Sequence, residues 1–333
     1  MRRLIVCSFF ICLIFGTSFR DGVGQVKTGT TGFRFLRLGI NAREVSMGGA
    51  GVASVRGVNA IHLNPALLHT EENIGMTFSH ISWIADVNYE SGAVAYNVEG
   101  IGTFAFNFNY LGLGDLNETD PLNLVDRPGG DLPGNFTDSR TFTFSDMAFG
   151  LSFARQITDK FAAGGRVSLI REHMTGTNAM TKNSPAFDIG ISYDTGWEGL
   201  EFGASTQNFG PDVTYFTRSF KLPLISRIGF SLNMLQAGGL FAQDGNQHRL
   251  TLLADALQPN DFEEQANLGA EYGFKELFFV RGGYRINADQ ESWSAGAGYC
   301  QSLQASQFNV DFAYGDFGDF LDSVYRVSVG FSY

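Results

Sequence analysis

The chain has 333 residues, of which 41 are glycine and 32 are phenylalanine, while only 17% are charged. This glycine and aromatic content is unusual for a soluble enzyme. The formal net charge of -11 argues against nucleic acid as a partner, because phosphate binding requires a basic surface.

The first residues have the pattern of a secretory signal peptide. Two arginines precede an apolar run from Leu4 to Phe15, and small residues follow it. This pattern predicts a signal peptide over residues 1–24, with cleavage before Gln25 or, alternatively, after Ser18. The protein is therefore expected to be exported.

The predicted mature chain holds a single cysteine, Cys300, so no internal disulfide framework is expected. We interpret Cys300 as an inert thiol on the lumen side or rim of a barrel. No later stretch approaches the ~20 apolar residues of a membrane helix. The mature chain is therefore either a secreted soluble protein or a membrane barrel.

Alternation of apolar and polar residues at period two dominates the chain after the signal peptide, as is typical of strands with two unlike faces. The stretches "TFAFNFNY" (103–110), "FDIGISYD" (187–194) and "RIGFSLNM" (227–234) show it plainly. A change of face near Asp146 suggests a bulge. Fourteen strands of about ten residues are predicted, beginning near Ile74, Asp86, Gly100, Thr141, Lys160, Ser184, Leu200, Lys221, Gln247, Glu264, Glu276, Gln290, Ser306 and Ser323.

The alternatives for such strands are a secreted β-sandwich and an outer-membrane barrel. The polar faces are rich in Gly, Ser and Asn and poor in lysine, which favours a barrel lumen over a soluble surface. The chain also ends in alternating apolar residues that resemble the insertion signal of outer-membrane barrels, namely Val327, Val329, Phe331 and Tyr333. We predict an all-β fold: a transmembrane antiparallel β-barrel of about 14 strands, spanning residues 74–333, in the cell outer membrane of a Gram-negative type.

The segment before the first strand carries the motifs Ala-Arg, Met-Gly-Gly-Ala and Asn-Pro-Ala. Together with "VRGGYRINADQESWSAGAGY" and the closing "FNVDFAYGDFGDFLDSVYRVSVGFSY", they resemble the PorV/PorQ family, a branch of the FadL-like barrels. The resemblance spans nearly the whole mature chain. It implies that residues 25–73 fold inside the lumen as a hatch. The motif residues are Arg43, Met47, Gly48, Gly49, Asn64, Pro65 and Ala66.

The chemistry of this segment agrees with a hatch. Glycines at 48, 49 and 51 allow positive φ and close backbone packing, and Pro65 keeps Asn64 out of a helix. A phosphate site is excluded, because Gly49-x-Gly51-x-x-Ser54 lacks the third glycine of a dinucleotide fingerprint.

Enzyme motifs are absent from the sequence. The five histidines have no metal-binding spacing, and neither a Gly-x-Ser-x-Gly elbow nor a Walker loop occurs. A catalytic site assembled from loops is the alternative that a sequence cannot show. His80 is interpreted as an interfacial polar residue near a strand end. We expect no enzymatic activity, no cofactor and no metal.

Charged residues on the polar faces of the strands are expected to point into the lumen, since a charge facing lipid costs ~2–4 kcal/mol. They are either a static network that fixes the hatch or a polar route past it. Arg281 and Arg285 share one face and are predicted to bind a carboxylate of the hatch or of a ligand. The set comprises Glu90, Arg166, Asp188, Glu201, Arg227, Glu271, Arg281, Arg285, Asp311 and Arg326.

Two functions follow from the resemblance. One is a partner-binding component of type IX protein secretion, with residues 113–140 as the main partner-binding loop. The other is a FadL-like transporter of fatty acids or other hydrophobic compounds through a lateral opening, which requires an apolar pocket near the hatch. The inward faces look polar, which counts mildly against a wide apolar channel. Expected partners are outer-membrane lipid, the barrel insertion machinery, secretion-system subunits or cargo, and a hydrophobic ligand.

Overall fold

The computed structural model describes residues 29–69, 72–117, 141–177, 179–197, 199–235, 239–241, 247–288, 291–318 and 322–333. The predicted signal peptide and both of its cleavage sites lie outside these residues. So does most of the predicted partner-binding loop at 113–140.

Fourteen of the described strands form one closed antiparallel barrel, in which β1 pairs with β16 at the seam. The predicted fold class is thereby confirmed. The barrel strands are β1 (Ile74–Ser82), β2 (Asn88–Val98), β3 (Gly102–Asn117), β4 (Thr141–Thr158), β5 (Phe161–Met174), β6 (Met180–Trp197), β7 (Leu200–Phe209), β10 (Ile225–Asn233), β11 (His248–Pro259), β12 (Gln265–Phe274), β13 (Phe278–Ile286), β14 (Trp293–Leu303), β15 (Ser306–Gly315) and β16 (Val324–Ser332).

The two faces of the barrel wall differ in chemistry as the alternation predicts. On β3, the aromatic residues of "TFAFNFNY" are exposed on the outside, while Thr103, Asn107 and Asn109 are buried inside. The same division holds on β6 and on β16. On β16, Arg326 and Ser328 are fully buried, whereas their neighbours Tyr325 and Val327 are exposed. A closed wall with an apolar outer face satisfies the backbone in lipid.

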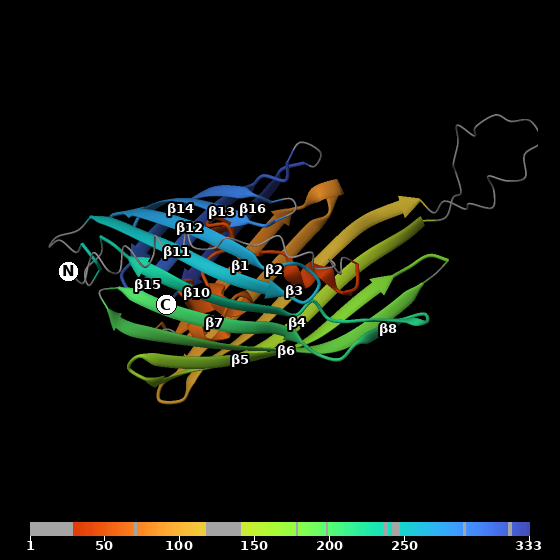
Figure 1. Ribbon diagram of the computed structural model, residues 1–333, viewed down its shortest axis with the longest axis horizontal. Helices are drawn as coiled ribbons and strands as arrows, with labels where there is room; N and C mark the ends of the chain where they lie inside the picture. The colour runs from red at the N-terminus through yellow and green to blue at the C-terminus, as the bar shows by residue number, and fades with distance from the viewer. Residues whose placement is uncertain are drawn as a thin grey trace, which may run out of the picture.

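The two ends of the barrel differ in their connections. At the end where Ile74 and Tyr333 exchange backbone hydrogen bonds, most connections are short turns such as 99–101 and 304–305; we call this the termini end. The opposite end, the loop end, carries the longer connections. Strands β3 to β6 have 14 to 18 residues and extend beyond their neighbours toward the loop end (Figure 1).

Several predicted strand boundaries need correction. β6 begins four residues before the predicted Ser184, and β10 begins four residues after the predicted Lys221. The residues between β7 and β10 form a small separate hairpin, β8 (Val213–Tyr215) and β9 (Arg218–Phe220), that the alternation did not predict. Apolar–polar alternation is too short in these three-residue strands to identify them.

The predicted change of face near Asp146 is wrong. Even-numbered residues of β4 point inward on both sides of Asp146, because Phe144 packs in the lumen while Ala148 and Ser152 are buried behind it. The register instead shifts on the neighbouring strand, between Leu113 and Leu116 of β3. The strand itself does not flip. Phe144 is an aromatic residue at an inward position because an apolar cluster occupies this part of the lumen.

The N-terminal segment lies inside the barrel and is folded from short helical turns (Figure 1). These are η1 (Arg34–Arg37), α2 (Ala42–Ser46), η2 (Gly57–His62) and η3 (Pro65–Leu68), while η4 (Ile84–Asp86) belongs to the connection between β1 and β2. Asn41 caps α2 by accepting a hydrogen bond from the Arg43 amide, and Asn64 caps η3 in the same way. We call residues 29–69 the hatch.

Candidate functional site: the hatch and the lumen

The hatch crosses the lumen from the loop end toward the termini end. Its start is fixed at the loop end, where the Gly32 amide donates to the Lys221 carbonyl at 3.0 Å. In the middle of the lumen, the Gly51 and Val52 amides both donate to Asp255 Oδ2 of β11, at 2.8 and 3.0 Å. The last hatch turn, η3, packs against β4, β5 and β6. The hatch is therefore attached to the barrel at its start, in its middle and near its end.

Close backbone approach explains the glycines of the Met-Gly-Gly-Ala motif. Gly48 has φ +69°, and a Cβ placed there would lie 2.9 Å from the Tyr284 amide nitrogen of β13. The facing residue on β13 is Gly283, where a Cβ would overlap Gly48 itself. Met47 is buried beside them in an apolar cluster with Leu63. A glycine on each side allows the hatch to touch the strand backbone directly.

The Asn-Pro-Ala motif fixes the hatch to the opposite wall. Asn64 is fully buried, and its Nδ2 donates to the Val52 carbonyl at 2.8 Å and to the Ile191 carbonyl of β6 at 3.0 Å. Its Oδ1 accepts from the Ala66 amide at 3.1 Å. The backbone of Asn64 is extended, as expected before Pro65. One side chain therefore joins two parts of the hatch to the barrel wall.

A buried charge network holds α2 against the wall at the termini end. Glu271 accepts from Arg43 of the hatch (Nε at 2.8 Å, Nη2 at 2.9 Å) and from Arg249 and Arg281 of the wall (2.8 and 2.6 Å). Arg281 also donates to Asp311 at 2.6 Å. The bidentate contact with Arg43 makes this a directional link between the hatch and the barrel.

The remaining predicted lumen charges also bind the hatch or each other. Arg285 donates to the Gly48 carbonyl at 2.8 Å, and Arg227 donates to the Gly49 carbonyl at 3.4 Å. Arg166 forms an ion pair with Asp188 and donates from Nη1 to His62 Nδ1 at 2.8 Å. Burial and the adjacent Arg166 charge hold the pKa of His62 well below its usual range, so the ring is neutral and accepts this bond.

An ion pair near one end of the hatch and a hydrogen bond near the other complete the set. Arg56 of the hatch contacts Glu201 at 2.6 Å near the termini end. Toward the loop end, Arg326 donates to the Gly39 carbonyl at 3.1 Å. Through these contacts, the charges that point into the lumen join the hatch to the wall or pair with each other, as in a static network.

Two predictions about individual charges need correction, one in full and one in part. Glu90 points outward, where its carboxylate lies 2.6 Å from His80 Nδ1 on the neighbouring strand, because Tyr89 takes the inward position. Arg281 and Arg285 do point inward, but no ion pair joins either of them to a hatch carboxylate. Arg281 binds wall carboxylates, and Arg285 binds Glu291 at 2.6 Å as well as a hatch carbonyl. Binding of a ligand carboxylate by these two arginines stays a prediction.

The other singled-out residues lie as follows. Cys300 is a buried free thiol on the inward face of β14. Val327, Phe331 and Tyr333 are exposed on the outer face, and Val329 lies half-buried between them. Their role as an insertion signal remains a prediction.

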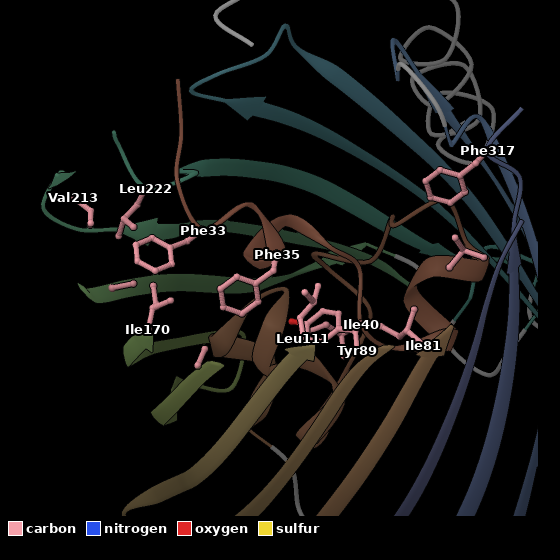
Figure 2. Close-up of a cluster of buried hydrophobic side chains, with 13 residues drawn as sticks. Phe33, Phe35, Ile40, Ile81, Tyr89, Leu111, Ile170, Val213, Leu222 and Phe317 are labelled. Carbon is pink, nitrogen blue, oxygen red and sulfur yellow. The ribbon is translucent and has the colours of Figure 1, made fainter. Parts of the chain in front are cut away.

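An apolar cluster fills the lumen at the loop end, which the sequence analysis did not anticipate. Phe33 and Phe35 of the hatch pack against inward residues of the wall, including Leu111 and Ile170 (Figure 2). The Phe35 and Tyr89 rings lie 6.2 Å apart, edge to face. The expectation that the inward faces are polar therefore does not hold at this end.

A pocket opens beside this cluster, with a volume of about 600 Å³. Its lining is mostly apolar and comes from both the hatch and the wall, including Phe33, Phe35, Leu111, Phe144 and Tyr215. The polar residues that line it include Arg34, Asp146 and Glu172. Each of the wall strands β3 and β4 contributes an inward apolar residue here, and only the closed barrel brings them together.

Nothing in the described part of the chain points to metal chemistry, since it contains no group of three His, Cys, Asp or Glu side chains that could hold an ion. No helix of the described residues is long and apolar enough to cross a membrane.

No protein-family model matches the sequence, and no curated protein matches it either. The fold, however, is similar to solved structures. The TodX monoaromatic hydrocarbon channel, as its deltaS2 mutant, has a TM-score of 0.58 at 12% identity, with 88% of this chain and 98% of that chain covered.

Two further structures give the same result. A Pseudomonas aeruginosa FadL homologue has a TM-score of 0.52 at 12% identity, covering 88% of this chain and 98% of its own. The Pseudomonas putida toluene transporter TodX has a TM-score of 0.53 at 12% identity, covering 87% and 96%. Within the FadL-like group, these findings do not single out the PorV/PorQ branch. The chain has the fold of the FadL-like barrels.

Proposed function

We propose that this chain is a non-enzymatic outer-membrane channel for small hydrophobic compounds, which bind in the apolar pocket at the loop end on their way past the hatch. The pocket is the observation that carries this proposal. Its volume of about 600 Å³ lies within the range of small-molecule sites, which are concave and mostly apolar. The exposed aromatic outer face supports a location in a membrane.

The composition of the pocket links ligand binding to the hatch. Phe33 and Phe35 belong to the hatch, whereas Leu111 and Phe144 belong to the wall. A ligand in the pocket therefore touches both parts at once, and its binding changes the contacts that hold the first hatch residues. Structures of similar fold include a monoaromatic hydrocarbon channel and a toluene transporter, which supports an apolar ligand.

The type IX secretion role stays a prediction of the PorV/PorQ resemblance. It requires a partner-binding surface on the long connection at 113–140, most of which lies outside the described residues. No contact within the described residues favours it over transport.

The test is uptake of radiolabelled toluene by Gram-negative cells that lack channels of this fold and express the chain. Expression should raise the uptake rate. Leu111→Trp fills the pocket from the inward face and should abolish most of that increase. Tyr110→Trp places the same side chain on the outer face of the same strand and should leave uptake unchanged.

Folding of each variant is checked by the heat-dependent shift in gel mobility that folded barrels show. Heat-shifted, membrane-inserted protein that does not raise toluene uptake would refute the transport function.

A further inference from the structure

Two carboxylates occupy the otherwise apolar pocket at the loop end. Asp146 of β4 and Glu172 of β5 are direct cross-strand partners and both point into the pocket. Asp146 is only 4% exposed and Glu172 only 8%. Directly opposed side chains have Cβ atoms about 5 Å apart, so the two carboxyl groups lie close together.

Neither carboxylate has a cationic partner among the described residues. Asp146 makes no hydrogen bond or ion pair with any of them, and its Oδ1 is buried without a donor. This distinguishes it from the acids of the hatch network, since Asp188, Glu271 and Asp311 are each bound by an arginine. Glu172 lies beside Tyr215, whose pKa is raised by burial and by the Glu172 charge.

Neither basic residue near the pocket, Arg34 or Lys182, forms an ion pair with these two carboxyl groups. Arg34 lines the pocket, but its side chain is exposed to solvent at the opening. Lys182 is the cross-strand neighbour of Glu172 on β6, yet no ion pair joins the two. The pocket therefore has an apolar body and an acidic polar end, where Asp146 has no partner among the described residues.

Such an end has a definite chemical preference. Buried carboxylates are acceptors, and leaving them without a donor is unfavourable. A ligand that brings an ammonium group or a hydroxyl supplies the missing donor, and the ammonium also offsets the repulsion between the two acids. A carboxylate ligand would instead bring a further acid, which lacks the needed donor, to the same site.

We propose that the pocket binds amphiphiles with a hydrogen-bond-donating head group, preferably a primary ammonium, and discriminates against carboxylates. The apolar tail packs against Phe33, Phe35 and Leu111, and the head group donates to Asp146 and Glu172. This inference rests on the proposed transport function and specifies its substrate class.

The experiment compares three ligands with one tail and different heads: hexylammonium, hexanol and hexanoate. Calorimetry at pH 7 with the purified full chain in a nonionic detergent measures each affinity. Charge-assisted hydrogen bonds predict that hexylammonium binds about tenfold or more tightly than hexanoate, with hexanol between them.

Two double variants locate the effect. Asp146→Asn/Glu172→Gln should remove the ammonium preference while retaining hexanol binding. Glu263→Gln/Glu264→Gln removes two carboxylates at the same end of the barrel but outside the pocket, and should leave the preference intact. The Asp146 change replaces an unpartnered buried carboxyl group by an uncharged amide of the same shape, so the variant is expected to fold.

The outcomes separate this inference from the proposed function. Hexanoate binding as tightly as hexylammonium, or an ammonium preference that survives in Asp146→Asn/Glu172→Gln, overturns the inference while the apolar site stands. Failure of all three ligands to bind the folded barrel overturns the transport function and the inference together.

Discussion

The contact between Gly48 and β13 provides a test of how tightly the hatch is packed. Gly48 and Gly57 both have φ near +70°, but their surroundings differ. A Cβ at Gly48 would lie 2.9 Å from a strand amide nitrogen, whereas a Cβ at Gly57 would meet nothing within 4 Å. Gly57→Ala is therefore a control that carries the same backbone strain without the steric overlap.

The two substitutions should differ by the cost of overpacking alone. An alanine in the left-handed region costs about 1–2 kcal/mol at either position. Overpacking adds typically ~1–3 kcal/mol at Gly48 only, because the overlapping atoms are strand backbone that cannot rotate away. A difference of this size corresponds to roughly 5–150-fold in the opening equilibrium of the hatch.

Hydrogen exchange of hatch peptides measures that equilibrium, since local opening exposes amides that are otherwise bonded. Gly48→Ala should accelerate exchange across residues 42–68 well beyond the acceleration caused by Gly57→Ala. Equal acceleration in the two variants would refute the reasoning, because it would mean that the hatch and β13 are not in backbone contact.

The same measurement checks three further predictions. Glu271→Gln should destabilise the hatch by about 3–5 kcal/mol, because it breaks a buried ion-pair network. The control Glu276→Gln changes a carboxylate that is 58% exposed and should cost at most ~1 kcal/mol. Similar costs for the two variants would contradict the network. Asn64→Ala should cost ~1–3 kcal/mol for each buried carbonyl left without its donor, and a hatch as protected as the wild type would show that these bonds are dispensable. Burial raises the pKa of Glu44 from 4.5 to about 7, so the hatch binds the proton more tightly than the unfolded chain does and its stability should fall as pH rises from about 4.5 to 7. Glu44→Gln should flatten this dependence once exchange is corrected for its intrinsic pH profile, and a slope that persists would assign the effect to another group.

The wall of this barrel could be predicted from sequence because its signal is local. Period-two alternation placed the starts of β1, β4, β7 and β15 at the predicted residues. The glycine motif around Gly48 likewise predicted positive φ and close packing, and both are present. These features depend on residues adjacent in the chain.

The lumen was harder to predict because its chemistry is assembled across strands. Leu111, Phe144 and Ile170 are large apolar residues on inward faces that carry mostly small or polar residues, and each looks like an exception on its own strand. Only strand register shows that they meet. Glu90 was misplaced for the same reason, since its neighbour Tyr89 points inward to join that cluster.

The hatch has a consequence for how the molecule assembles. Its hydrogen bonds reach far along the chain: the Ala42 amide donates to Ser328 Oγ, 286 residues later. These partners become available only after β13 to β16 have been added, and such distant contacts form slowly. The hatch therefore reaches its final position only when the last strands are in place. Pairing of β1 with β16 and docking of the hatch in the lumen then occur together, late in assembly.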